Sequence, residues 1–583
     1  MSAGAAGRNS FKIYLIKPSH YDDDGYVIQW WRSLVPSNSL ACVYGLVSTA
    51  ISNGLLGPDV ETEIVPIDES NTVVDCRAIS RAIKAAGAGL VGLVGVQSNQ
   101  FPRALDIARE LRASDVQVAV GGFHVSGCLA MLSGLPLGLK EAVDLGVTVF
   151  AGEGEGAFDD LIRDAYLGQL RPIYNRMDSL PNLAGAEIPF LPARTVRQVV
   201  TDFTSFDAGR GCPFQCSFCT IINVQGRKSR YRTADDVERI IRSNAAQGVT
   251  NFFVTDDNFA RNRNWEAILD RIILLREQEG FSPSLIFQVD TLCHRIPNFV
   301  SKAARAGCIS VFIGLENINP ESLRGSKKRQ NRTSEYREML LEWRRHGVLT
   351  TAGYILGFPS DTPDSIRRDI DLIKRELPID ILEFFILTPL PGSEDHKKLY
   401  VAGASLDQDL NRYDLEHVCA DHPSMDRSSL QNIYREAWDR YYTDAHIETL
   451  FQRGLASGIR SRRKLRDDIL LFSGAVRIEG VHPLQFGIFR RKVRTQRRPE
   501  LPREHPIAFY PHRMIEIARS ATQWVILLVR QRRIYRRVFA EARQGRRYVD
   551  EALMRSIALP PSQQSALELP QDGEAVQQVE AWG

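Results

Sequence analysis

The stretch that decides the fold of this chain reads Gly209-Arg-Gly-Cys-Pro-Phe-Gln-Cys-Ser-Phe-Cys-Thr220. It spaces Cys212, Cys216 and Cys219 as C-x3-C-x2-C. Three thiolates this close form a half-shell suited to a soft metal centre. A [4Fe–4S] cluster normally takes four cysteines, so a set of three leaves one iron without a protein ligand. An open coordination position is where a metal does chemistry rather than structural work.

A structural zinc knuckle is the alternative for this loop. It would need a fourth cysteine or histidine close by. The nearest following candidates are Cys293 and His294, which lie far along the chain. The spacing therefore favours an open iron–sulfur site.

The motif resembles that of the radical S-adenosylmethionine (SAM) superfamily. Phe218, just before the third cysteine, matches the aromatic position of that family. The resemblance implies a [4Fe–4S] cluster on Cys212, Cys216 and Cys219, whose open iron binds the amino and carboxylate groups of SAM.

Length and composition describe a multidomain globular protein. At 583 residues the chain is too long for one core, which predicts two to four domains. Hydrophobic content of 44% and charged content of 25% are typical of soluble proteins. The first residues lack the apolar core of a signal peptide, and no apolar run approaches the ~20 residues of a membrane span. With six scattered, unpaired cysteines, this predicts a cytoplasmic protein.

Residues 1–170 alternate strand and helix signals, which predicts a doubly wound, Rossmann-like parallel sheet. The expected helix covers 102–113. The expected strands cover 11–16, 61–66, 90–96, 116–120 and 148–150.

In such a sheet the ligand crevice lies outside the carboxyl ends of the strands. Three expected strands end in Gln97-Ser98-Asn99, Gly121-Gly122-Phe-His124 and Gly152-Glu153-Gly154-Glu-Gly156. Paired glycines would let a large ligand approach the backbone closely. The last segment is not the dinucleotide motif G-x-G-x-x-G, and it stands at the wrong end of the domain.

This arrangement resembles the cobalamin-binding domain that precedes the barrel in one large radical SAM class. The Gly-Gly-x-His and Gly-Glu-Gly-Glu turns are its landmarks. The resemblance implies that cobalamin is bordered by Ser98, Gly121, Gly122, His124, Gly152, Glu153 and Gly154. The Asp-x-His-x-x-Gly motif is absent, so we expect cobalamin bound base-off without a histidine ligand. The alternative is a Rossmann-like module that binds no cofactor or only part of the substrate.

Two segments connect the domains or border the crevice. The loop 21–39 is long and aromatic, with Trp30 and Trp31, and could cap cobalamin, face the barrel or pack on the surface. Closely spaced prolines make 171–204 a linker.

From 205 to 400 the strand–helix rhythm resumes and predicts a partial (β/α)6 TIM-type barrel. Polar residues or glycine follow each strand, and in such barrels the carboxyl ends of the strands build the active site. The six expected strands cover 205–208, 251–255, 285–289, 309–313, 348–356 and 379–387.

The resemblance to radical SAM proteins covers this whole region. It implies that Asp256, Asp257 and Asn258 contact the SAM amino group, Glu316 the ribose, and the backbone at Gly357 the adenine. Each of these residues singly could instead serve a turn. No dedicated acid–base residue is apparent.

Residues 401–557 are mainly helical, with a long helix expected over 514–540, and 558–583 read as a disordered tail. Residues 451–550 hold 24 Lys and Arg against 8 Asp and Glu. This basic region could contact an acidic membrane surface, hold phosphates, or be a solvated face. No nucleic-acid-binding signature is present.

The resemblance implies the chemistry. A flavodoxin- or ferredoxin-type donor reduces the cluster, SAM is cleaved to a 5′-deoxyadenosyl radical, and the radical abstracts hydrogen from an unactivated carbon. With cobalamin present, the enzyme is a C-methyltransferase. A cyclase or rearrangement enzyme with the same cofactors is one alternative, and a non-catalytic cobalamin- or SAM-binding sensor or scaffold is another. The aromatic loop and the basic helix favour a small, lipid-like substrate.

Overall fold

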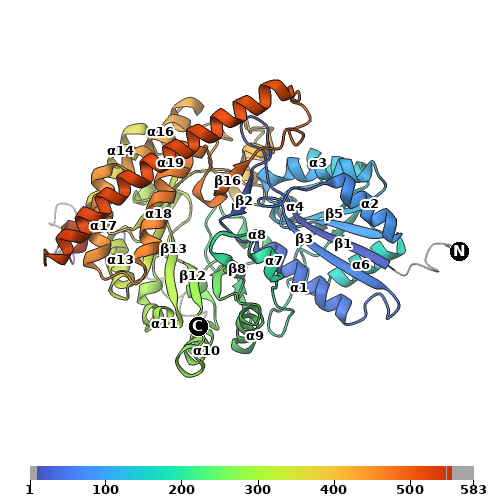
Figure 1. The fold of residues 1–583 in the computed structure, drawn as a ribbon, viewed down its shortest axis with the longest axis horizontal. Helices are drawn as coiled ribbons and strands as arrows, with labels where there is room; N and C mark the ends of the chain where they lie inside the picture. Colours follow the sequence, from blue (N-terminus) through green and yellow to red (C-terminus); the bar gives the residue numbers. More distant parts are fainter. Residues whose placement is uncertain (1–9, 547, 555–583) are drawn as a thin grey trace.

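A computed structural model describes residues 10–546 and 548–554. Two six-stranded parallel sheets lie side by side, and a helical region covers one of them (Figure 1). This α/β architecture confirms the fold class predicted from the sequence. The predicted tail at 558–583 lies outside the described residues.

The N-terminal sheet has the strand order β3-β1-β4-β5-β6-β7, and all of its strands are parallel. Helices α1 and α6 pack on one face and α2 to α5 on the other, which makes the sheet doubly wound. The strands are β1 (Ser10–Lys17), β3 (Glu61–Asp68), β4 (Gly89–Leu93), β5 (Gln117–Gly121), β6 (Thr148–Ala151) and β7 (Ile173–Asn175). The helices are α1 (Asn38–Ser52), α2 (Cys76–Ala86), α3 (Phe101–Arg112), α4 (Phe123–Met131), α5 (Leu137–Asp144) and α6 (Phe158–Leu167).

The sheet therefore includes one strand, β7, from the predicted linker. The remainder of 171–204 runs as irregular chain with the short helix α7 (Ala193–Val196).

The second sheet has the order β15-β14-β13-β12-β11-β8, again entirely parallel. It forms the predicted six-stranded partial barrel, and its apolar side chains make the largest core cluster. Among the described residues β8 does not pair with β15, so the barrel is open. The strands are β8 (Phe203–Phe206), β11 (Asn251–Val254), β12 (Ser284–Val289), β13 (Cys308–Glu316), β14 (Leu349–Leu356) and β15 (Ile381–Ile386). The helices are α9 (Ala234–Ala245), α10 (Trp265–Glu279), α11 (Phe299–Ala306), α12 (Pro320–Gly325), α13 (Tyr336–Arg345) and α14 (Pro363–Glu376).

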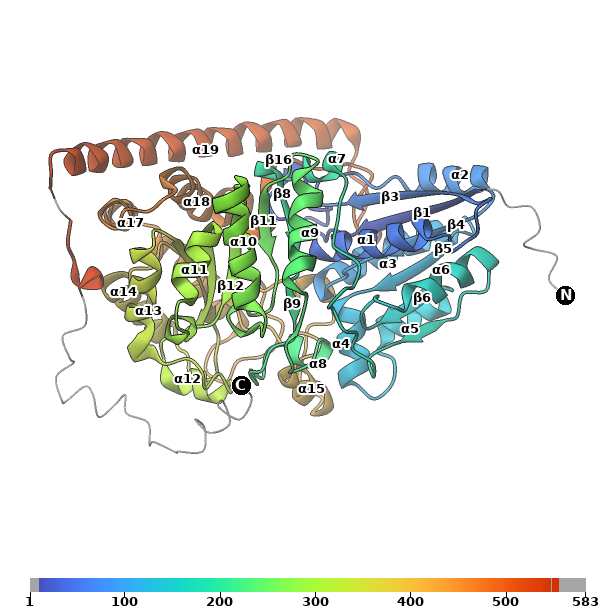
Figure 2. The same cartoon turned by 90° about the horizontal axis from the view of Figure 1, so that it is seen from below.

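The C-terminal region is helical, as expected, and ends in one exceptionally long helix. Helix α19 (Pro506–Arg543) has 38 residues and lies along one face of the molecule, over α17 and α18 (Figure 2). The other helices are α15 (Glu394–Val401), α16 (Arg427–Tyr441), α17 (Asp444–Ala456) and α18 (Arg462–Gly474).

The aromatic loop is partly a strand. β2 (Gln29–Ser33) pairs antiparallel with β16 (Gly487–Arg491), which ties the N-terminal region to the C-terminal one. Trp30 is buried there and donates its indole N–H to the carbonyl oxygen of Gln485 at 2.8 Å. Within the described ranges, none of the helices has both the length and the apolar character needed to span a bilayer.

Candidate functional site

The cysteine loop lies at the carboxyl end of β8, between β9 (Gly209–Arg210) and α8 (Ile221–Val224). β9 pairs with β10 (Arg230–Tyr231) and fixes the start of the loop. Gly211 has φ +90°, and a Cβ there would lie 2.5 Å from the Lys228 carbonyl oxygen. Only glycine therefore fits directly before Cys212.

The three thiols are gathered in one partly buried place. Cys216 is buried, and Cys212 and Cys219 are half-buried. Burial raises the pKa of both Cys212 and Cys219 to about 12, and for Cys219 the charge of Cys216 adds to this. Thiolates so close together repel one another, and a soft metal centre is the partner that stabilises them. The donor set therefore fits an iron–sulfur cluster.

The spacing of these sulfurs is not that of a single-ion site. In the described part of the chain, no three His, Cys, Asp or Glu side chains are arranged around one metal ion. In a [4Fe–4S] cluster each cysteine ligates an iron of its own, so the ligands need not converge on one point.

The acidic residues after β11 hold the cysteine loop in place. The Asp256 carboxylate accepts hydrogen bonds from Ala208 N at 2.6 Å and from Asn262 Nδ2 at 2.8 Å. The Asp257 carboxylate accepts from Gly211 N at 2.8 Å. Burial raises the pKa of both carboxyl groups to about 7.

Asn258, the third residue of this predicted SAM-binding group, lies beside the carboxyl end of β12. Asn258 donates through Nδ2 to Asp290 at 2.9 Å, and Asp290 also accepts from Arg261 Nε at 2.7 Å. The structure thus brings Asp256, Asp257 and Asn258 to the barrel mouth, already hydrogen-bonded to protein groups.

Glu316, at the end of β13, is paired with the buried ammonium group of Lys328. Its backbone has a positive φ of 62°, a conformation that is rare for a side-chain-bearing residue and is often found at functional sites. Lys328 Nζ lies 5.8 Å from the centre of the Phe218 ring. The neighbouring Gln330 donates through Nε2 to Cys216 Sγ at 3.5 Å.

Gly357 ends β14 in a turn that requires glycine, with φ +92°. Its N–H and that of Phe358 both donate to the Asp361 carboxylate at 2.9 Å. The rings of Phe218 and Phe358 lie 6.5 Å apart, so this turn reaches the cysteine loop.

At the carboxyl edge of the N-terminal sheet, Ser98 and His124 bond to each other, with 3.1 Å between Oγ and Nδ1. His124 also lies with its ring centre 4.6 Å from that of Phe101. Burial lowers the pKa of His124 to about 3, so this imidazole is neutral. Beside it, His396 Nδ1 is buried with no hydrogen-bond partner among the described residues.

At the glycines of this edge, other atoms of the protein approach the backbone closely. From the sequence we expected a ligand to approach there. A Cβ on Gly122 would lie 2.2 Å from Val96 N, and one on Gly121 would lie 3.0 Å from Phe150 O. On Gly154 it would lie 2.2 Å from the Phe158 ring. The contacts of these glycines are thus explained by packing within the domain.

The turn after β6 connects the two sheets through buried charges. Gly152, with φ +104°, precedes Glu153, whose carboxylate accepts from Arg210 Nη1 at 2.5 Å and from Arg230 Nη1 at 2.9 Å. Glu155 accepts from Arg210 Nη2 at 2.7 Å. Arg210 stands two residues before Cys212, so the predicted cobalamin turn directly contacts the cysteine loop.

A buried aspartate completes this network. Asp207 accepts from Arg210 Nε at 3.0 Å and lies 3.6 Å from Arg232 Nη2. Burial alone would raise its pKa, but the two guanidinium groups outweigh burial and hold the pKa near 2. Asp207 is therefore ionised at neutral pH.

Sequence reasoning missed several residues of this region: Asp207, Arg210, Glu155, Lys328 and Gln330. Arg210 lies inside the opening motif, between two glycines, and that position was the available signal. Lys328 and Gln330 lie in a segment after α12 that has no recognisable motif, so only the fold brings them to the cysteines.

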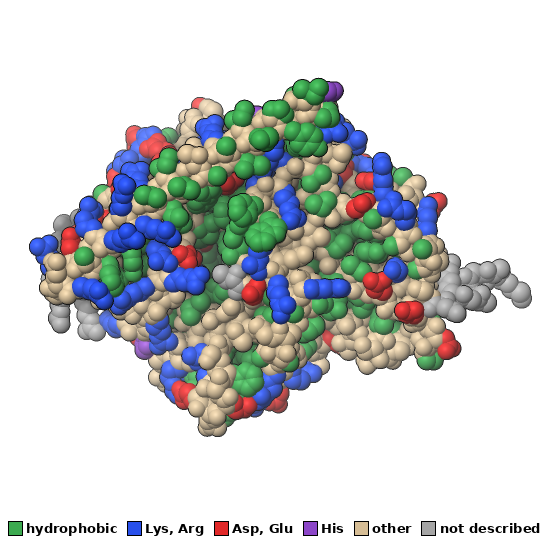
Figure 3. Space-filling model, in the orientation of Figure 1, with side chains coloured by type: hydrophobic (Ala, Val, Ile, Leu, Met, Phe, Trp, Pro, Cys, Tyr) green, Lys and Arg blue, Asp and Glu red, His purple; other side chains and the backbone are tan. Residues whose placement is uncertain are grey.

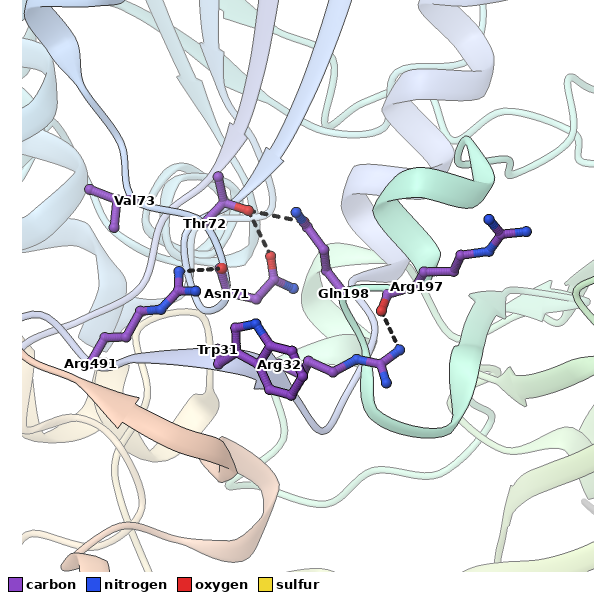
Figure 4. A pocket seen from close by; sticks show the side chains of 8 residues that line it. All are labelled: Trp31, Arg32, Asn71, Thr72, Val73, Arg197, Gln198 and Arg491. Atoms are coloured by element: carbon purple, nitrogen blue, oxygen red, sulfur yellow. Dashed lines mark hydrogen bonds between the residues drawn. The ribbon is translucent and has the colours of Figure 1, made fainter. Parts of the chain in front are cut away.

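A surface pocket of about 380 Å³ lies beside β2, and its lining includes no residue of the cysteine loop (Figure 4). Its lining side chains mostly bond to one another. Thr72 Oγ1 lies 2.9 Å from Asn71 Oδ1 and 3.0 Å from Gln198 Oε1, and Arg491 donates to the Asn71 carbonyl oxygen. These contacts do not suggest a catalytic role for the pocket.

Comparison with known proteins identifies a family model that matches the barrel region. The model of the Radical SAM superfamily matches residues 208–373, which include the cysteine loop and the ends of β11, β13 and β14.

Two characterised relatives share part of the sequence. The bacteriochlorophyllide d C-12(1)-methyltransferase of Chlorobaculum tepidum is 26% identical over 318 residues, which cover 53% of this chain and 65% of that protein. The hopanoid C-2 methylase of Rhodopseudomonas palustris is 25% identical over 295 residues, which cover 49% of this chain and 53% of that protein. The match thus spans less than two thirds of either relative.

The fold has a counterpart among solved structures. The cobalamin-dependent S-adenosylmethionine radical enzyme OxsB, in its apo form, aligns with a TM-score of 0.51 over 93% of this chain and 82% of its own. The two sequences are only 13% identical, so the likeness is one of fold.

Proposed function

Because residues 208–373 are a radical SAM domain, we propose that this protein is a cobalamin-dependent radical SAM C-methyltransferase. One observation carries the proposal: the three thiols lie where the carboxyl ends of two parallel sheets meet. Helix α8, directly after the cysteines, packs against α4 at the end of β5. Asn223 of α8 also donates to the Gly392 carbonyl oxygen at 2.9 Å. Parallel α/β folds bind their ligands at such strand ends.

The cysteine loop would hold the cluster. When bound, a [4Fe–4S] cluster supplies the electron for SAM cleavage and cobalamin carries the methyl group. Cys212, Cys216 and Cys219 would ligate iron, and Gln330 would hydrogen-bond the Cys216 sulfur. Asp256 and Asp257 keep the loop in place through its backbone N–H groups. Lys328 adds a buried positive charge that would offset the negative charge of the thiolates.

Residues of the barrel mouth would hold SAM. Glu316 is the proposed ribose acceptor, with Lys328 orienting its carboxylate, and Asp256, Asp257 and Asn258 would border the amino group. The turn at Gly357 would present its backbone to the adenine. The Phe218 ring lies near both Phe358 of this turn and Lys328, and it would exclude water from the site.

The N-terminal edge would hold cobalamin. Ser98, His124 and His396 Nδ1, which has no partner in the described part of the chain, are buried polar groups of the kind that a ligand with amide side chains can satisfy. Gly121, Gly122 and Gly152 shape the backbone of this edge, and Glu153 links it to the cysteine loop. Because the Asp-x-His-x-x-Gly motif is absent and Nδ1 of His124 is bonded to Ser98, we expect His124 to border cobalamin rather than ligate cobalt.

Both named relatives methylate their substrates, which supports methyl transfer by this chain. Their names specify different substrates, a bacteriochlorophyllide and a hopanoid. A small, lipid-like substrate and a flavodoxin- or ferredoxin-type donor in the cytoplasm are parts of the proposal.

An anaerobic assay tests this function. The protein is reconstituted with iron, sulfide and cobalamin and incubated with SAM and a reductant, and 5′-deoxyadenosine and S-adenosylhomocysteine are measured. Both products are expected. An intact cluster without deoxyadenosine would contradict radical chemistry. 5′-Deoxyadenosine without S-adenosylhomocysteine or retained corrinoid would favour the cyclase or rearrangement enzyme.

A further inference from the structure

The outward face of α19 is apolar over most of its length. Eight large apolar side chains between residues 507 and 529 are 41% to 79% exposed. They are Ile507, Tyr510, Met514, Ile515, Ile517, Val525, Ile526 and Val529. Folded proteins rarely leave so many large apolar side chains exposed along one element unless that surface has a partner.

The same face becomes basic toward the end of the helix. Val525, Val529, Arg532 and Arg536 follow one another at spacings of four, three and four residues, so they share one side of α19. Arg533 lies beside them. These three arginines are exposed and form no ion pair among the described residues. Their charge is thus available to an external partner.

The inner side of helix α19 packs on the rest of the molecule, so the orientation of its exposed face is fixed. Its inner side buries Phe509, Leu527, Ile534 and Val538. Arg537 also pairs with Glu448 of α17 at 2.5 Å. The outer face therefore cannot be covered by a rotation of the helix without loss of this packing.

A second apolar element lies on the same face. Trp31 of β2 and Phe489 of β16 are 52% and 74% exposed, and their ring centres are 6.0 Å apart. Figure 2 shows α19 and β16 on one side of the molecule, and β2 is paired with β16. In the space-filling view hydrophobic side chains follow the path of α19, with Lys and Arg gathered near one of its ends (Figure 3).

We propose that this face, formed by α19 with Trp31 and Phe489, binds the surface of an anionic lipid bilayer. Apolar side chains would enter the boundary between headgroups and acyl chains, with α19 lying in the plane of the membrane. Trp31 and Tyr510 are side chains that favour this interface. Arg532, Arg533 and Arg536 would reach the lipid phosphates.

A second copy of the chain fits this face poorly. In an isologous contact, antiparallel α19 helices would set the arginines of one copy against the apolar segment of the other. Parallel helices would set arginines against arginines. An anionic bilayer accepts the apolar segment and the arginines together.

Co-sedimentation of the full chain with vesicles tests the proposal. We expect binding to phosphatidylcholine vesicles that contain phosphatidylglycerol, much weaker binding to phosphatidylcholine alone, and release by added salt. The assay needs neither SAM nor a reductant, so its outcome is independent of the proposed methyl transfer.

Two variants separate the contributions. Arg532→Gln, Arg533→Gln and Arg536→Gln combined should lower the affinity for anionic vesicles about a hundredfold, at roughly a factor of five per charge near the surface. Val525→Ser with Ile526→Ser should weaken binding to a similar degree without changing the melting temperature, because both side chains are exposed. The matched control is Arg163→Gln, Arg305→Gln and Arg345→Gln, three exposed arginines on α6, α11 and α13.

Three results would overturn the proposal. They are failure of the wild-type chain to bind anionic vesicles, equal loss of binding in the control, and wild-type binding by both face variants. If light scattering instead shows a dimer that Val525→Ser with Ile526→Ser dissociates, and vesicles do not bind, the face belongs to a second copy.

Discussion

The two parallel sheets share one topology but differ in the chemistry of their carboxyl edges. Each has six parallel strands. The barrel edge carries thiols, carboxylates and the buried Glu316–Lys328 pair. The N-terminal edge has a neutral core, in which uncharged His124 bonds to Ser98. The parallel sheet determines where a binding site forms. The residues that follow each strand determine which ligand can bind there.

Arg210 makes most of the charged contacts between the two edges, and Arg230 also pairs with Glu153. Arg210 contacts Glu153 and Glu155 from the N-terminal sheet and Asp207 from the barrel. All four side chains are at most 9% exposed. The orientation of the two edges therefore depends on buried charges beside the cysteines.

The largest expected effect is the loss of a different cofactor at each edge. Replacing Cys212, Cys216 and Cys219 with Ala should abolish cluster assembly, because no thiolate ligands remain. Iron and sulfide content after anaerobic reconstitution is the measurement. His124→Ala, at the other edge, should keep the cluster and lose bound corrinoid instead. Cys76→Ala, in the core of the N-terminal domain, is the matched cysteine control and should retain both. Wild-type iron content in the triple variant would refute the ligand assignment.

The second prediction concerns the link between the edges. Arg210→Met leaves three buried carboxylates without their shared partner, and breaking a buried ionic network costs about 3–5 kcal/mol. We expect a clear fall in the midpoint of urea unfolding of the apo protein. Arg163→Met removes an exposed ion pair with a 4.0 Å separation and should change stability by about 0.5 kcal/mol or less. Equal midpoints for the two variants would mean that the network does not hold the sheets together.

The sequence predicted those parts of the molecule that depend on local pattern. The apolar strand runs gave both sheets, including all six strands of the barrel. The spacing of Cys212, Cys216 and Cys219 located the loop at the barrel mouth, although the cofactor roles of the individual residues stay predictions.

Features that depend on contacts between distant segments were not predicted. The pairing of β2 with β16 joins segments more than 450 residues apart, and nothing in the loop 21–39 specifies that partner. Glu153 contacts Arg210 only because the two sheets pack together, and the sequence does not reveal that packing. Sequence alone also does not reveal that the backbone of Val96 lies beside Gly122, so the close packing at this glycine was not predicted.

The third prediction concerns a titratable link between the N-terminal loop and the C-terminal region. His417 pairs with Asp414 at 2.9 Å and with Asp23 of the N-terminal loop at 3.2 Å. Burial alone would lower the pKa of His417, but the hydrogen bonds and charges of the two carboxylates raise it to about 10. A raised pKa in the folded state stabilises the protein fully below the unfolded value, near 6.5, and that stabilisation is lost as pH rises through 10.

The wild-type protein should therefore lose about 1–2 kcal/mol between pH 6.5 and pH 10 from this group, after allowance for the exposure of Asp23. Urea unfolding at several pH values measures the loss. His417→Gln should lack this component of the pH dependence. Identical pH profiles for wild type and His417→Gln would rule out a contribution from this link.

The smallest expected effect lies at the Ser98–His124 pair of the N-terminal edge. Ser98→Ala removes one neutral hydrogen bond to His124, which is worth about 0.5–1.5 kcal/mol, far less than the charged network. Ser80→Ala is the matched control, because the Ser80 hydroxyl is also buried and donates to the Cys76 carbonyl oxygen at 2.8 Å, within α2. Both variants should show similar small shifts in the urea midpoint. Only Ser98→Ala should reduce corrinoid retention, measured by visible absorbance after desalting, because only Ser98 lies at the carboxyl edge. Equal retention in the two variants would remove Ser98 from the cobalamin site while leaving the iron–sulfur assignment intact.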